Sequence, residues 1–125
     1  MDKRKILIVD DDREFLEELE ETLVLSDYEP IAINDSRVAL DTARSTKPDL
    51  IVLDLKMDDI DGFHLAELLK KSPETAPIPI IAMTGFFLKE KRSSLLTSCG
   101  IETCIKKPFS PLDVISKIET ILSKK

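Results

Sequence analysis

The chain has 125 residues, of which 42% are hydrophobic and 34% are charged, the balance of one ordinary globular domain over residues 1–125. Its net charge of −6 and its lack of a basic patch argue against nucleic acid as a direct partner. No apolar stretch is long enough to span a membrane, and the start "MDKRK" does not lead into a signal peptide, so we expect a cytoplasmic protein.

Short apolar runs rich in β-branched residues predict buried strands. Each run ends in polar or turn-forming residues, which is typical of strands that cross a core and finish at its surface. The predicted strands are Ile6–Val9, Pro30–Ile33, Leu50–Leu53, Ile78–Met83 and Ile101–Ile105.

Helical periodicity fills the segments between these runs. Asp12 is the expected cap of the first helix, and Ser36 is a good N-cap for the second. Ser110 is the expected N-cap of the last helix, with Pro111 at the first helical position, and Gly100 is expected to close the weaker fourth one. The predicted helices occupy residues 13–25, 36–45, 62–71, 86–98 and 110–125.

Strands that alternate with helices in this way predict an α/β fold, a doubly wound parallel sheet with helices on both faces. In such sheets, binding groups gather at the carboxyl ends of the strands. The first strand ends in three aspartates and the third in one, while a threonine follows the fourth strand and a lysine the fifth. These residues are Asp10, Asp11, Asp12, Asp54, Thr84 and Lys107.

Carboxylates that converge on one edge repel one another, so a divalent cation is their natural partner. Ligands that are all oxygen favour a hard ion, and Mg²⁺ first. A lysine and a hydroxyl nearby would suit a phosphoryl group, and Asp54 could be the nucleophile that accepts it. Cys99 and Cys104, with only the distant His64, do not have zinc-site spacing and are expected to be buried, reduced thiols.

Four motifs together resemble the receiver domains of two-component response regulators. They stand in the order and spacing of that family and cover nearly the whole chain, and the resemblance implies a flavodoxin-like (βα)5 fold with strand order 2-1-3-4-5. The motifs are "ILIVDDD", "PDLIVLDLKMDDIDGF", "PIIAMTG" and "KKPFS".

The resemblance also implies a role for each matching residue. Asp54 corresponds to the phosphorylated aspartate, and Asp10 and Asp11 to the acidic pair that binds Mg²⁺, Asp11 directly and Asp10 through water. Lys56 corresponds to the position whose backbone carbonyl binds the metal. Thr84 matches the switch hydroxyl, and Lys107 matches the lysine that pairs with phosphate, ahead of a cis bond to Pro108.

The function implied is that of a signalling phosphoacceptor rather than a true enzyme. A histidine kinase or histidine phosphotransfer protein would donate the phosphoryl group to Asp54, and the domain would assist both this transfer and its own dephosphorylation. The face built by the fourth helix, fifth strand and fifth helix would then change. That face would act on a downstream effector or an attached output domain, as a monomer or as a phosphorylation-dependent dimer.

Cys104 departs from the family, because many relatives carry an aromatic residue there that moves with the switch threonine. Cys104 therefore does not predict the aromatic coupling from Thr84 to the output face, and the alternative interpretation is a pseudo-receiver that binds partners without phosphorylation. A haloacid-dehalogenase-type phosphatase would need an aspartate where Lys56 stands. A nucleotide-binding protein would be expected to carry a glycine-rich phosphate loop, and no such motif is present.

Overall fold

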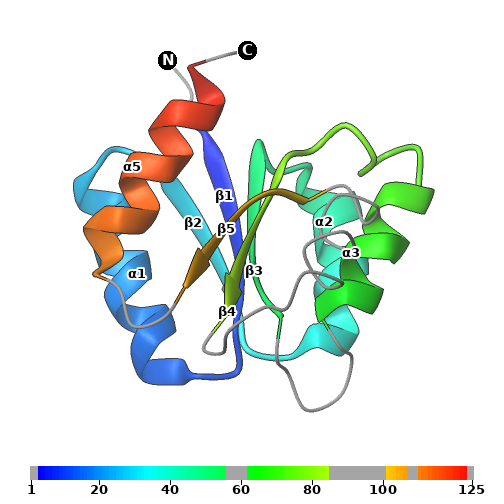
Figure 1. Ribbon diagram of the computed structural model, residues 1–125, viewed down its shortest axis with the longest axis horizontal. Helices are drawn as coiled ribbons and strands as arrows, with labels where there is room; N and C mark the ends of the chain where they lie inside the picture. The colour runs from blue at the N-terminus through cyan, green and yellow to red at the C-terminus, as the bar shows by residue number, and fades with distance from the viewer. Residues whose placement is uncertain (1–2, 56–61, 85–100, 107–109, 124–125) are drawn as a thin grey trace.

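The computed structural model describes residues 3–55, 62–84, 101–106 and 110–123, and within them the strands form one parallel sheet. The order in the sheet is β2-β1-β3-β4-β5 (Figure 1), so the predicted doubly wound, flavodoxin-like topology is confirmed. The strands are β1 (Lys5–Val9), β2 (Glu29–Ile33), β3 (Leu50–Asp54), β4 (Ile80–Thr84) and β5 (Ile101–Lys106).

Helices cover both faces of the sheet (Figure 1). Helices α1 (Arg13–Leu25) and α5 (Pro111–Leu122) lie on one face, while α2 (Ala39–Thr46) and α3 (Gly62–Lys71) lie on the other. The helix predicted at 86–98 and its closing Gly100 lie outside the described residues. Of the helices that are described, none has both the length and the apolar character needed to cross a membrane.

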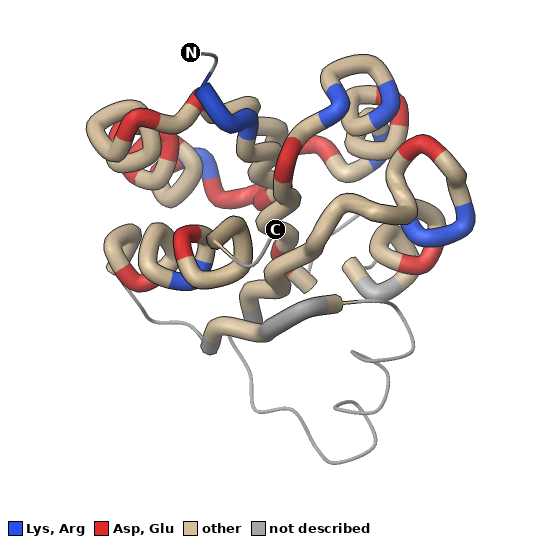
Figure 2. The backbone as a smooth tube through the Cα atoms, turned by 90° about the horizontal axis from the view of Figure 1, so that it is seen from above, with Lys and Arg blue, Asp and Glu red and all other residues tan. Residues whose placement is uncertain are grey.

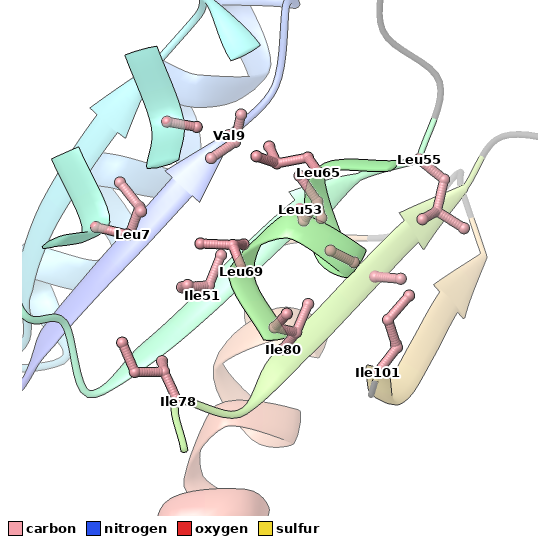
Figure 3. Packing of buried hydrophobic residues seen from close by; sticks show 14 residues of the cluster. Leu7, Val9, Ile51, Leu53, Leu55, Leu65, Leu69, Ile78, Ile80 and Ile101 are labelled. Atoms are coloured by element: carbon pink, nitrogen blue, oxygen red, sulfur yellow. The ribbon is translucent and has the colours of Figure 1, made fainter. Parts of the chain in front are cut away.

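Two hydrophobic clusters lie on opposite faces of the sheet. Since successive side chains of a strand point to opposite faces, Leu7 and Val9 of β1 join the cluster under α2 and α3, while Ile6 and Ile8 join the one under α1 and α5. This double burial explains why the central strands are unbroken apolar runs. Figure 3 shows the first cluster, where Leu65 and Leu69 of α3 pack over the strands.

Charged residues lie around this apolar interior, with acidic and basic positions interspersed (Figure 2).

On α1 the inward residues Leu16, Leu19 and Leu23 are buried, as the predicted periodicity requires. On α5, Val114 and Ile118 are fully buried, and the backbone N–H of Ser110 donates to an Asp113 carboxylate oxygen at 3.1 Å. The predicted start of this helix is therefore confirmed, with Pro111 at its first position.

Two predicted element starts differ from the structure by two residues or more. Ser36 does not cap the second helix: Asp35 caps a 3₁₀ turn over Ser36–Val38, and α2 begins only at Ala39. The side chain of Asp35 accepts from the Arg37 backbone N–H at 2.9 Å, so the aspartate next to the predicted cap makes the cap bond instead. Strand β4 begins at Ile80 rather than Ile78, because the Ile78 N–H closes a turn onto the Thr75 carbonyl.

Strand β2 lies at the edge of the sheet and, among the strands that the structure describes, pairs only with β1. Glu29 donates its N–H to the Arg4 carbonyl, and the Ile33 carbonyl accepts from Asp10, so these odd-numbered residues face β1. The backbone groups of Pro30 therefore point outward, where proline offers no N–H. A proline at this place removes a donor from the exposed edge and hinders pairing with another chain.

The Pro30→Val variant is therefore expected to self-associate through β2. Its free energy of unfolding should fall by about 0.4–1 kcal/mol, because valine gives the unfolded chain more conformational entropy than proline does. The restored backbone N–H adds a donor to the exposed edge of β2, where another chain can pair with it. Sedimentation velocity over a concentration series measures the association. Glu29→Val is the matched control, since it adds the same side chain to the same strand without a new outward donor. Equal sedimentation of Pro30→Val and wild type would contradict the prediction.

Candidate functional site

Three aspartates at the ends of two neighbouring strands meet at the carboxyl edge of the sheet. One carboxylate oxygen of each of Asp10, Asp11 and Asp54 lies within 4.8 Å of the others. The strand register explains the meeting, because Val9 of β1 stands beside Leu53 of β3, which brings the following residues, Asp10 and Asp54, side by side. The predicted convergence of these three residues is therefore confirmed.

Their exposure differs. Asp10 is fully buried and Asp54 retains 5% of its surface, whereas Asp11 is exposed. Two ionised carboxylates held this deep are costly unless positive charge or hydrogen bonds compensate them. The exposed Asp11 leaves the cluster open toward solvent on its own side, so an ion could reach it from there.

The loop after β1 is fixed by hydrogen bonds that start at Asp10. Its backbone N–H donates to the Ile33 carbonyl at 3.1 Å, and its carboxylate accepts from the Asp12 N–H at 3.0 Å. Asp12 in turn caps α1, accepting from the N–H groups of Glu14 and Phe15 at 3.1 and 3.3 Å. The predicted capping role of Asp12 is confirmed. The hydrogen bond from the Asp12 N–H to the Asp10 carboxylate was not predicted, although an aspartate side chain commonly accepts from the N–H two residues on.

The end of β3 is braced by its neighbours. The Leu55 N–H donates to the Met83 carbonyl at 2.9 Å, and the Gly62 N–H donates to the Leu55 carbonyl at 3.1 Å. A Cβ at Gly62 would lie 2.5 Å from the carbonyl oxygen of Asp54 and 2.5 Å from the Leu55 Cα. Only glycine therefore allows α3 to begin against the backbone of Asp54.

Thr84 is the last residue of β4, at the same edge of the sheet. Asp54 stands beside Met83 in the ladder, so the backbone of Thr84 lies one residue beyond the level of Asp54. Lys106 ends β5 beside Thr84, and Lys107 is the next residue. Lys56, Lys107 and the Lys107–Pro108 bond lie outside the described residues, so their predicted roles stay predictions.

Asp35, at the end of β2, does not join the acidic cluster. Arg37 holds its carboxylate with two side-chain hydrogen bonds of 3.0 and 2.9 Å, and these bonds, followed by the Arg37 backbone N–H, lower the pKa of Asp35. Asp35 instead caps the 3₁₀ turn that follows β2. His64 is exposed on α3.

Cys104 lies on β5 beside Ala82 of β4 and packs against the cluster under α2 and α3. Its thiol is half-buried, and this burial raises its pKa, which disfavours the reactive thiolate. Cys104 is therefore a free thiol, as predicted, but it is only partly buried. Cys99 lies outside the described residues. A half-buried cysteine offers much less surface than an aromatic ring at the same place.

The donor set fits Mg²⁺. Three carboxylates that lie within reach of a common ion offer only oxygen ligands, and no histidine or cysteine belongs to the cluster. Zn²⁺ and other softer ions prefer nitrogen or sulfur ligands. Asp10, Asp11 and Asp54 are the described side chains that could hold the ion.

Comparison with known proteins identifies the family of this chain. The family model of the response regulator receiver domain matches residues 6–119. The polar-differentiation response regulator DivK of Brucella anthropi is 31% identical over 119 residues, which cover 95% of this chain and 96% of DivK. The alkaline phosphatase synthesis transcriptional regulatory protein PhoP of Bacillus subtilis is 32% identical over 97% of this chain and 49% of its own length. The chain therefore spans about half of PhoP.

A solved structure shares the fold closely. The CheY-like response regulator receiver domain protein of Methanospirillum hungatei superposes with a TM-score of 0.90 at 27% identity, covering 98% of this chain and 96% of that one. The acidic cluster therefore stands in the fold and sequence context of this family. The chain belongs to the response regulator receiver domains of two-component signalling.

Proposed function

We propose that this domain accepts a phosphoryl group on the Asp54 carboxylate from a phosphohistidine of a kinase or phosphotransfer protein. The observation that carries the proposal is the acidic cluster, in which the nearly buried Asp54 meets Asp10 and Asp11 at the carboxyl edge of the sheet. Membership of the receiver family supports it, since these domains take phosphate from histidine kinases.

Asp54 would act as the nucleophile. One of its carboxylate oxygens forms the new P–O bond while the P–N bond of the donor phosphohistidine breaks, and the electron pair of that bond stays on the imidazole nitrogen. The product is an acyl phosphate at the end of β3. The burial of Asp54 limits the water that can reach this reactive bond.

The other acids would hold the cation that the transfer requires. Asp10, Asp11 and Asp54 supply carboxylate ligands, and the Lys56 carbonyl is proposed to complete the protein's share. Bound Mg²⁺ supplies positive charge that offsets the charge of the transferring phosphoryl oxygens. Lys107 is proposed to add a second positive charge on that group.

Thr84 would couple phosphorylation to the surface of the domain. Its hydroxyl is proposed to bond the phosphoryl group and so to shift the populations of the conformations of the surface that includes β5 and α5. That surface would contact a partner or an attached output domain. With Cys104 on β5 in place of an aromatic residue, the shift would depend on backbone and helix movement rather than on a swinging ring.

Intact-protein mass spectrometry tests the proposal. Metal-free protein is incubated with acetyl phosphate in Mg²⁺ or in EDTA, and the labelled residue is located after borohydride reduction of the acyl phosphate. One added phosphoryl group on Asp54 that requires Mg²⁺ is the expected result. A folded protein that takes no phosphoryl group would refute the proposal and favour a binding module that works without phosphorylation.

A further inference from the structure

Asp12 has a place in the structure that neither of its neighbours shares. Asp10 and Asp11 belong to the acidic cluster, while the Asp12 carboxylate faces the first turn of α1. One of its oxygens accepts from the N–H groups of Glu14 and Phe15 at 3.1 and 3.3 Å. A cap of this kind removes unpaired donors and sets where the helix begins.

Asp12 is also held from the other side. Its own N–H donates to a carboxylate oxygen of the buried Asp10 at 3.0 Å, and its carbonyl accepts from the Leu16 N–H at 3.0 Å. A continuous series of hydrogen bonds therefore runs from the acidic cluster through Asp12 into α1. Leu16, Leu19 and Leu23 then pack this helix onto the sheet.

Asp11 lies between these two fixed residues. It is exposed, so packing does little to hold its backbone or its carboxylate in place. The bond between Asp10 and Asp12 spans Asp11 and closes the chain around it. The backbone on the C-terminal side of Asp11 is therefore held by the anchoring of Asp12 on Asp10 and on α1.

We propose that Asp12 is a positioning residue of the metal site, acting through its cap on α1 rather than through its charge. This inference rests on the proposed function, because it concerns the cation that the acidic cluster would hold. Residues that orient metal ligands typically change metal affinity about 10- to 100-fold when they are removed. By linkage, the cation should in turn stabilise the first turn of α1.

Mg²⁺ titration calorimetry on metal-free protein tests the proposal with three variants. Asp12→Ala removes the cap, and we expect its affinity to fall about tenfold. Asp12→Asn keeps an equally good cap without the charge, and we expect it to stay within about twofold of wild type. Asp35→Ala is the matched control, because it removes another capping aspartate at the same edge of the sheet but outside the cluster.

A second readout needs no metal. In the metal-free Asp12→Ala variant, the N–H groups of Glu14 and Phe15 should exchange with solvent faster than in wild type, and in Asp12→Asn they should not. In wild type, Mg²⁺ should slow their exchange further. If Asp12→Ala does not fold, Asp12→Gly removes the same side chain at a position where glycine is tolerated as an N-cap.

The possible outcomes separate this role from others. If Asp12→Asn binds as weakly as Asp12→Ala, charge rather than the cap matters and the proposal is wrong. If Asp12→Ala melts earlier but binds Mg²⁺ like wild type, the cap is purely structural and the proposal is also wrong. In both of these outcomes the wild type still binds Mg²⁺, so the proposed function stands although the role of Asp12 is rejected. A wild type that binds no Mg²⁺ overturns the proposed function and the role of Asp12 together.

Discussion

Asp54→Asn is expected to abolish phosphoryl uptake and, in the absence of metal, to make the protein more stable. Asparagine keeps the shape of the side chain but lacks the nucleophilic carboxylate. It also removes one of the carboxylates that lie within 4.8 Å of one another. Two unit charges at that separation repel by about 3 kcal/mol at an effective dielectric constant of about 20, and solvent near the exposed Asp11 reduces this.

We therefore expect a gain of about 1–2 kcal/mol in the free energy of unfolding of Asp54→Asn in EDTA. Urea denaturation with and without Mg²⁺ measures it, and Mg²⁺ should raise the stability of wild type more than that of the variant. Asp41→Asn is the control, since it makes the same change at an exposed residue of α2. A less stable Asp54→Asn variant in EDTA, or one that still takes the phosphoryl group on residue 54, would contradict this account.

Gly62→Ala is expected to destabilise the protein by about 1–3 kcal/mol, the usual cost of overpacking. The new Cβ would lie 2.5 Å from both the carbonyl oxygen of Asp54 and the Leu55 Cα, and these backbone atoms cannot turn aside as a flexible side chain would. The sign of this change in stability is informative, because Gly→Ala inside an exposed helix normally stabilises a protein by about 0.5–1 kcal/mol.

The overpacking at Gly62→Ala would act on the backbone of Asp54, the proposed phosphoryl acceptor. Moving the backbone of Asp54 would displace its carboxylate from Asp10 and Asp11, so phosphoryl uptake should slow together with the loss of stability. Urea unfolding and the rate of mass increase with acetyl phosphate measure the two effects. His64→Ala changes an exposed residue of the same helix and should stay within about 0.5 kcal/mol of wild type. A Gly62→Ala variant as stable as wild type would show that α3 can begin elsewhere.

Several features could be predicted from the sequence because their causes are local. Helical periodicity predicted α1 over residues 13–25, and the choice of Asp12 and Ser110 as caps followed from the side chains that accept bonds from a first turn. The run of apolar residues before Asp54 predicted a strand buried on both faces. The failures were also local: at Ser36, a neighbouring aspartate competed successfully for the same capping bond.

The site divides in the same way. The sequence by itself determined which residues stand at the carboxyl ends of the strands, because strand length and turn chemistry decide this. Only the tertiary structure decided that Asp10 and Asp54 lie side by side, since this requires β1 and β3 to be neighbours in register. It alone also decided that Gly62 meets the backbone of Asp54, because that contact depends on how closely α3 docks onto the sheet, which no local pattern of residues encodes.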